Sequence, residues 1–329
     1  MVEKTVAEDL NSFKGKLPLS EALMRLEQQG KIRVAEQTGK MIILPVRNKK
    51  AILEELEAFK EKEHIFYVDY GNLMPLFKAC KALKKPLLIK GPTGVGKTTF
   101  LQHMAQKEDL PLVTVLSHNN INSTDVVGKL IPFGDYFAWE DGLLVKAIVG
   151  GAIFYFDEVV NVDSETLSML YSITDHRRFV VVPDTGELIR PDDKFMLVAS
   201  YNPGSKYTKK KLPPAFEQRF ICAVLEYPPP EVEKDIVKGN GINTEIASLV
   251  VRVMTELREG ASMDFKELPG TRLSVLAAEL IQNHKLSVKD AFRVVLAAVL
   301  DTGETIENIL SDIVVPAAGG EEKTKKKGD

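Results

Sequence analysis

A glycine-rich loop between an apolar run and a helical segment constrains this chain more than any other feature. The stretch KPLLIKGPTGVGKTTF fits the pattern G-x-x-x-x-G-K-[ST] at residues 91–98. Glycines let a backbone turn so tightly that its N–H groups point inward and can cradle phosphate oxygens. In a strand–loop–helix context this pattern predicts a nucleotide-binding site, because the start of the following helix also favours anions. The alternative is a glycine turn that binds nothing.

The loop assigns a role to its polar side chains. Lys97 would bring a positive charge to the β- and γ-phosphates, and the Thr98 hydroxyl would bind Mg²⁺. The residues that we expect to contact the nucleotide are Gly91, Pro92, Thr93, Gly94, Val95, Gly96, Lys97, Thr98 and Thr99.

Two further apolar runs end in residues suited to phosphate chemistry. GAIFYFDE ends in Asp157 and Glu158, and KFMLVASYN ends at Asn202. The ends of adjacent parallel strands face one crevice. Asp157 would hold Mg²⁺ through water, and Glu158 would orient and deprotonate the water that attacks the γ-phosphate. Asn202 would bond the γ-phosphate or that water, or else simply start the turn at 202–204. The second carboxylate favours hydrolysis over transfer to another molecule.

The pattern of apolar runs predicts an α/β fold. KKPLLIKG, LPLVTVLSH, GAIFYFDE, KFMLVASYN and FICAVLEYP have the length and apolarity of buried strands in a parallel sheet. We therefore expect an α/β nucleotide-binding core over 66–228, a helical lid over 229–315 and a disordered tail over 316–329. Residues 1–65 combine two helical patterns with a hairpin pattern and predict a small α/β appendage of unknown role.

Composition limits the remaining classes. Forty-three basic and forty-six acidic residues give a formal net charge of −3, which does not indicate a general nucleic-acid or membrane-surface binder. The longest uncharged apolar run, 147–156, is far shorter than the ~18–20 residues that span a bilayer. The first residues lack the apolar segment of a signal peptide, and Cys80 and Cys222 sit in no metal or redox spacing. We expect a cytoplasmic protein with reduced thiols.

In their order along the chain, the motifs resemble those of the AAA+ ATPases, and among them the MoxR-type CbbQ/NirQ/NorQ/GvpN group. The resemblance covers about residues 66–310. It rests on GPTGVGKTTF, STDVVGKL, WEDGLL, FDEVVN, ITDHRRF, SYNPG, FEQRF and GTRLSVLAAEL. It implies ATP as the nucleotide and hydrolysis to ADP and phosphate as the reaction.

The resemblance also assigns roles to residues of the motifs. Gly91–Thr98 corresponds to the Walker A loop, Asp157 and Glu158 to the Walker B pair, and Asn202 to sensor 1. Two catalytic arginines complete this set. Arg219 falls on the arginine finger, which reaches the ATP of a neighbouring subunit, and Arg272 falls on sensor 2 of the lid.

Assembly and partners follow from the same resemblance. A finger that acts in trans implies a ring, most often a hexamer. Proteins of the group resemble chaperone-like activators that work with a von Willebrand factor A (VWA) domain partner on a client enzyme or assembly. Residues 119–145 resemble the helix-2 insert and 179–190 the pre-sensor-1 hairpin, which in the family face the pore or the substrate. Surface hairpins without a client role are the alternative.

Some patterns remain open. His176, Arg177 and Arg178 would make a second contact to phosphate in trans, or form a solvated helix end. Lys206 and Lys209–Lys211 would attract an acidic partner or nucleic acid, or form a solvated loop. In the fold that the chain resembles, Ile65–Val68 would line the adenine pocket.

Two functions of other classes also remain open. One is an AAA+ nucleic-acid motor, and the other is a nucleotide-gated interaction module whose N-terminal segment binds the partner. That segment and the loop SKYTKKKLPPAF differ from the usual pattern of the group and leave the client open.

Overall fold

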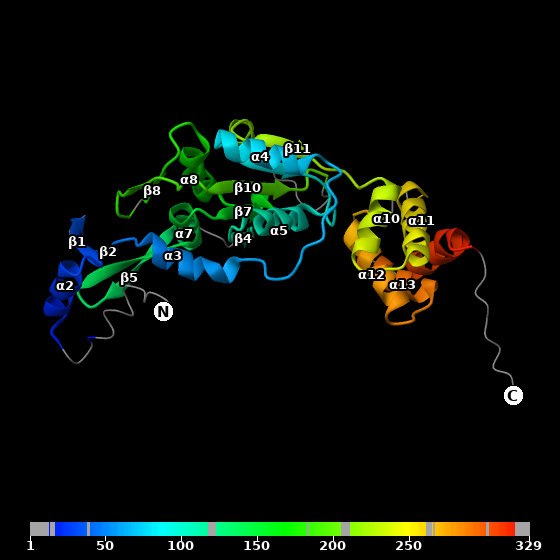
Figure 1. Ribbon diagram of the computed structural model, residues 1–329, viewed down its shortest axis with the longest axis horizontal. Coiled ribbons are helices and arrows are strands. Elements are labelled where there is room, and N and C mark those ends of the chain that lie inside the picture. Colours follow the sequence, from blue (N-terminus) through cyan, green and yellow to red (C-terminus); the bar gives the residue numbers. More distant parts are fainter. Residues whose placement is uncertain are drawn as a thin grey trace.

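Three blocks of secondary structure follow one another along the molecule in Figure 1: a mixed sheet near the N-terminus, a parallel α/β core and a bundle of helices. The computed structural model describes residues 13, 17–37, 40–117, 123–182, 184–204, 211–260, 265, 267–300 and 303–319. In these ranges no helix combines the length and the apolar character that crossing a bilayer requires.

The core contains a parallel sheet with the strand order β11-β3-β10-β7-β4. Its strands are β3 (Leu87–Lys90), β4 (Leu112–Leu116), β7 (Ile153–Asp157), β10 (Met196–Tyr201) and β11 (Ile221–Val224). They are the five apolar runs of the sequence, so the predicted parallel α/β sheet is confirmed. Because all five run the same way, the phosphate loop after β3, the acidic end of β7 and the residue after β10 meet at one edge.

Helices cover both faces of this sheet, and the alternation of strand side chains explains how. Ile153 and Tyr155 pack into the cluster formed with α4 (Leu73–Leu83) and α5 (Lys97–Glu108). Phe154 and Phe156 pack on the other side, against α7 (Leu143–Gly150) and α8 (Ser164–Thr174). Neighbouring residues of a strand point to opposite faces, so a strand that is apolar throughout needs cover on both.

The N-terminal strands belong to a sheet that the sequence did not predict. The expected hairpin of β1 (Ile32–Gln37) and β2 (Lys40–Pro45) is present. A second hairpin, β5 (Gly128–Phe133) and β6 (Tyr136–Asp141), lies within the expected helix-2 insert. β2 pairs in parallel with β6, which gives the order β1-β2-β6-β5. The appendage is therefore no separate unit, because an isolated two-stranded hairpin is marginal and gains stability from a second one.

Arg47 ties this sheet to a third hairpin. Its guanidinium donates to both carboxylate oxygens of Asp141 at 2.7 Å and to Glu187 at 2.6 Å. Glu187 precedes β9 (Leu188–Ile189), which pairs with β8 (Val180–Val181) in the expected hairpin over 179–190. One side chain thus joins the N-terminal segment to both expected inserts.

Helix α3 (Lys49–Leu56) fastens the N-terminal segment to the core. It follows α2 (Leu19–Gln28) and the hairpin along the chain and packs against α7. The contact is close, since a Cβ atom on Gly150 would lie 2.5 Å from a methyl carbon of Leu56.

The C-terminal block is a helical bundle around its own apolar core. It contains α10 (Pro230–Gly239), α11 (Thr244–Gly260), α12 (Thr271–Gln282), α13 (Val288–Ala297), α14 (Gly303–Ile309), a π-helical turn (Leu310–Val314) and α15 (Val315–Ala317). The helix continues past residue 316, where we expected a disordered tail, because Ala317 and Ala318 pack on the lid core. Residues 320–329 of that tail lie outside the described residues.

Candidate nucleotide site

A cavity of about 670 Å³ lies between the core and the lid, a size typical of ligand sites. The core lines it with residues 93–99, Asp157 and Glu158. The lid contributes Ile236, Asn240, Thr271, Arg272, Val275, Leu276 and Glu279. The structure thus brings most of the predicted site residues to one cavity, with the predicted sensor 2 arginine facing the phosphate loop.

The phosphate loop has the backbone that its glycines allow. Gly96 has a φ of 97°, a left-handed conformation that favours glycine, and α5 begins at the next residue. The ammonium group of Lys97 donates to the carbonyls of Gly91 at 2.8 Å and Pro92 at 3.0 Å. Burial lowers the pKa of Lys97, although the nearby Glu158 and Asp157 oppose this effect. The loop therefore holds a buried cation beside the cavity, where phosphate would meet it.

Two residues that the sequence did not single out organise the carboxylate of Asp157. The hydroxyls of Ser200 and Tyr155 donate to its Oδ1 at 2.6 and 2.8 Å. The Tyr155 hydroxyl also lies beside the Thr98 side chain, so it stands between the two expected Mg²⁺ ligands. Burial raises the pKa of Tyr155, which keeps this hydroxyl protonated. The sequence does contain a signal for these two residues, because a Tyr and a Ser interrupt strands that are otherwise apolar, and a buried hydroxyl needs a hydrogen-bond partner.

Glu158 stands in a strained and charged environment. Its φ is 56°, which is uncommon for a residue with a side chain. Burial raises the pKa of its carboxyl, and Asp157 adds to this, whereas Lys97 and the backbone N–H of Asn202 oppose it. Local strain and a shifted pKa in a cavity are both features of functional residues.

The lid rests directly on the phosphate loop. The backbone N–H of Arg272 donates to the Gly94 carbonyl at 3.2 Å. A Cβ atom on Gly270 would lie 2.5 Å from the Thr93 carbonyl oxygen, so only glycine fits this approach. Movement of the lid therefore changes the surroundings of the loop.

A lid carboxylate that the sequence did not single out, Glu267, lines a second cavity of about 520 Å³, which shares Thr93, Gly94 and Arg272 with the first. Glu267 Oε1 accepts a hydrogen bond from the Thr93 backbone N–H at 3.0 Å and another from the Asn202 side-chain amide. Asn202 is buried and does not itself line the 670 Å³ cavity; its side-chain amide bonds Glu267, and its backbone N–H lies beside the Glu158 carboxylate. No pattern distinguishes Glu267 in the sequence, since a lone glutamate in a loop is most often solvated.

Part of the cavity wall is aromatic, and one of its rings contacts the phosphate loop, since the Tyr70 hydroxyl donates to the Val95 carbonyl at 2.8 Å. Phe66, Tyr67 and Tyr70 line this part of the wall, so part of the predicted adenine segment 65–68 faces the cavity. Helix α5 holds this segment, because Gln106 accepts from the Ile65 N–H at 3.3 Å. The hydroxyls of Tyr67 and Thr271 are buried and have no hydrogen-bond partner in the described part of the chain. Unpaired buried hydroxyls that line a cavity indicate a polar ligand.

Arg219 lies apart from this cavity, after the short helix α9 (Pro214–Glu217) and before β11. Its guanidinium stacks 4.6 Å over the Tyr171 ring, and its Nε is buried without a partner among the described residues.

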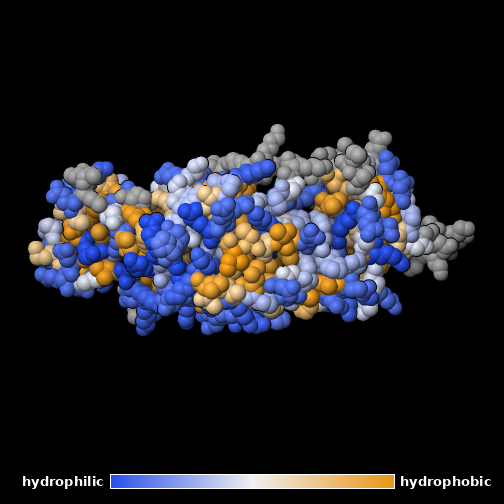
Figure 2. Space-filling model, turned by 90° about the horizontal axis from the view of Figure 1, so that it is seen from above, coloured by the Kyte–Doolittle hydropathy of each residue, from blue (hydrophilic) through white to orange (hydrophobic). Residues whose placement is uncertain are grey.

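Figure 2 shows an apolar patch over the middle of the molecule, around α4 and the edge strand β11. Leu83 and Val224 on these elements are 65% and 70% exposed.

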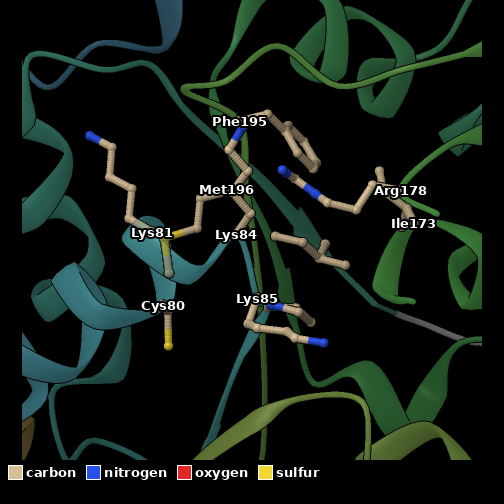
Figure 3. A pocket seen from close by; sticks show the side chains of 10 residues that line it. Cys80, Lys81, Lys84, Lys85, Ile173, Arg178, Phe195 and Met196 are labelled. Atoms are coloured by element: carbon tan, nitrogen blue, oxygen red, sulfur yellow. The ribbon is translucent and has the colours of Figure 1, made fainter. Parts of the chain in front are cut away.

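The other predicted cations do not reach the cavity either. In Figure 3 Arg178 points toward Phe195 and Met196, into a cavity of about 10 Å³, which has room for about one water molecule and is too small for a phosphate. Arg177 pairs with Asp175 at 2.8 Å. Of the basic loop, Lys206, Lys209 and Lys210 lie outside the described residues, and Lys211 is exposed.

Family profiles and related proteins match both the core and the lid of this chain. The profile "AAA domain (dynein-related subfamily)" matches residues 86–220, and "CbbQ/NirQ/NorQ C-terminal" matches residues 233–316. The Denitrification regulatory protein NirQ of Stutzerimonas stutzeri is 38% identical over 66% of this chain and 80% of that protein. Protein NorQ of Paracoccus denitrificans is 39% identical over 65% and 80%. Among solved structures, the RuvB Holliday junction branch migration motor of Thermotoga maritima has a TM-score of 0.40 at 15% identity, over 76% of this chain and 69% of that chain.

Proposed function

Because this chain belongs to the MoxR-type CbbQ/NirQ/NorQ family of AAA+ ATPases and so binds and hydrolyses ATP, we propose that it is a chaperone-like remodeller of a client enzyme or assembly. The observation that carries the proposal is the cavity shared by core and lid. A nucleotide held there touches both blocks, so hydrolysis would change how they fit together. This change is the motion that a remodeller applies to its client.

In this proposal, each step of ATP hydrolysis is assigned to a particular residue. Lys97 and Asn202 bind the terminal phosphate, and Arg272 draws the lid toward it. Glu158 takes a proton from the attacking water, a role supported by its position in the cavity and its raised pKa. Arg219 of a neighbouring subunit stabilises the charge of the transition state.

We include Mg²⁺ in the proposal, held by Thr98 and Asp157. The fit of these residues is supported by the Tyr155 hydroxyl, which donates to Asp157 at 2.8 Å and lies beside the Thr98 side chain. Within the described ranges no group of three or more His, Cys, Asp or Glu could hold a metal. This donor set suits an ion that takes its remaining ligands from phosphate and water. When bound, Mg²⁺ neutralises charge on the phosphates.

The proposal places the chain in a ring, most simply a hexamer. Arg219 lies outside its own cavity, and its guanidinium contacts the Tyr171 ring and the Ala215 carbonyl but no carboxylate in the described part of the chain, so its charge is available to a nucleotide of another subunit. The exposed apolar patch on α4 and β11 gives the next copy a surface beside it. The cytoplasm would supply ATP and keep Cys80 and Cys222 as the free thiols they are here.

Mixing two inactive variants tests the shared site. Arg219→Ala and Lys97→Ala should each lose turnover, by ~10³–10⁵-fold for the arginine. In a mixture, a Lys97→Ala subunit still provides Arg219, and a neighbouring Arg219→Ala subunit still provides an intact phosphate loop. Some sites between the two are therefore complete, so ATPase activity should return in part. Arg252→Ala, an exposed lid arginine, is the control and should be fully active. A mixture as inactive as its components, or an active Arg219→Ala variant, would refute the role in trans.

A VWA-domain protein is the partner that we propose, together with a client enzyme. The name of NirQ supports a regulatory role, since that relative is described as a denitrification regulatory protein. Steady-state ATPase rates of the full chain with a purified VWA protein from the same source should rise above the basal rate. Stimulation by DNA instead would favour a nucleic-acid motor over the remodeller.

A further inference from the structure

We propose that the Glu267 carboxylate competes with the terminal phosphate of ATP and so determines how strongly the site prefers ATP to ADP. The inference rests on the nucleotide site described above and adds a residue that sets its specificity. It starts from an unusual contact, in which a carboxylate from the lid takes donors that face a phosphate site.

The bonds of Glu267 define the competition. A single oxygen, Oε1, accepts from the Thr93 N–H at 3.0 Å and from the Asn202 amide. A terminal phosphate that uses Asn202 needs the same amide. ADP, which lacks that phosphate, does not need it. Displacement of Glu267 is therefore required for ATP and not for ADP.

Charge acts in the same direction. The charge of Glu267 acts to raise the pKa of both Lys97 and Glu158, although burial lowers that of Lys97 overall, so this negative charge lies within electrostatic reach of the phosphate loop. Like charges at this distance repel, and the repulsion is screened less in a partly buried site than in water. A third phosphate held by Asn202 would meet this repulsion directly, because Asn202 is the residue that Glu267 contacts.

The chain around Glu267 links its displacement to the lid. The Tyr227 hydroxyl donates to the Leu268 carbonyl at 3.0 Å, and Arg258 Nε donates to the Pro269 carbonyl at 2.9 Å. These bonds fix the backbone directly after Glu267, and Gly270 rests on the phosphate loop. Because this backbone is held, expulsion of the carboxylate strains the lid contact and signals that the third phosphate is present.

Nucleotide titrations of Glu267→Gln test the proposal. Glutamine keeps the shape and an acceptor oxygen but removes the charge. Fluorescent ADP and a fluorescent β,γ-imido analogue of ATP, which is not hydrolysed, are titrated into the full chain. We expect the Kd of the ATP analogue to fall roughly tenfold and the Kd of ADP to change less than about twofold. Glu256→Gln makes the same charge change on an exposed face of α11 and should alter neither Kd.

Other outcomes overturn the proposal. An equal change for both nucleotides would mean that Glu267 acts on the whole lid, and weaker binding of the ATP analogue would mean that it positions Asn202 for phosphate. Glu267→Ala should shift the ratio in the same direction as Glu267→Gln, and thermal melts show whether both variants are folded. Undiminished binding of both nucleotides by Lys97→Ala would instead refute the phosphate site, whatever the ratio in the Glu267 variants.

Discussion

At the scale of single residues, Glu158 is a functional group that lowers the stability of the folded state. Its carboxyl is half-buried, its pKa is raised and its backbone is left-handed. An acid whose pKa is higher in the folded state binds its proton more tightly there, so ionisation at neutral pH weakens folding. The contribution of Glu158 to the free energy of unfolding is therefore present at low pH and is lost as the pH rises through the raised pKa.

Glu158→Gln should therefore gain stability while it loses activity. Its thermal midpoint at pH 7 should rise above that of the unaltered chain, because no charge remains to be desolvated. Its ATPase rate should fall ~10²–10⁴-fold with the general base. In the unaltered chain the rate should fall on the acid side at a pH above the usual range of glutamate. A melting temperature that drops in the variant, or a rate that stays level below pH 4.5, would contradict this assignment.

Arg47 offers a second test on one residue. Its side chain is 10% exposed and binds two carboxylates, which a lysine cannot match because it lacks the planar fork. We expect Arg47→Lys to lower the free energy of unfolding by about 1–3 kcal/mol in urea. Arg33 also contacts Glu187, at 3.1 Å, but is 59% exposed, so Arg33→Lys should change stability by less than about 1 kcal/mol. Equal effects of the two substitutions would show that burial of Arg47 contributes nothing.

At the scale of elements, a buried ion pair holds the lid helices together. Glu233 on α10 is fully buried and accepts from Arg258 on α11 at 2.6 and 2.8 Å and from Ser274 on α12 at 2.7 Å. Glu233→Ala leaves Arg258 without its carboxylate and should reduce lid stability by about 3–5 kcal/mol. Hydrogen exchange of α10 to α12 would measure the loss. Glu231→Ala, on the exposed side of the same helix, should leave that exchange unchanged.

The elements also show how far the sequence predicts this fold. The strands of the core were predicted because burial on both faces makes each a continuous apolar run, as in β7. The loop after β3 and the carboxylates after β7 followed from their local patterns. The pairing of β2 with β6 could not be predicted, since two separate hairpins carry no local signal of which edges meet. The sequence did not single out Glu267 for the same reason, because its position in the site depends on a contact with Thr93, 174 residues earlier in the chain.

At the scale of the whole molecule, the N-terminal segment is part of the structural core. Deletion of residues 1–62 removes α3 from α7 and leaves the edge of β6 unpaired. We expect the truncated chain to melt at a lower temperature and to expose apolar surface, which a fluorescent hydrophobic dye would detect. A deletion that melts and hydrolyses ATP like the full chain would instead support a separable interaction module.

A point substitution in the contact between α3 and α7 tests the same idea without removing a whole segment, so it distinguishes loss of this contact from a general failure to fold. Leu56 is 1% exposed and packs on Gly150, so Leu56→Ala should lower the free energy of unfolding by about 2–5 kcal/mol. Leu53→Ala in the same helix, at a partly exposed position, should lower it by less.

The parallel pairing of β2 with β6 has a consequence for how the chain is made. Ile42 and its partner Phe137 are separated by about 95 residues. At a synthesis rate of ~5–20 residues per second, the first hairpin leaves the ribosome roughly 5 to 20 seconds before the strand that completes its sheet. For that interval the edge of β2 that later pairs with β6 is unpaired, and an exposed strand edge is a template for aggregation. We therefore expect the nascent chain to depend on chaperones until β6 has been made.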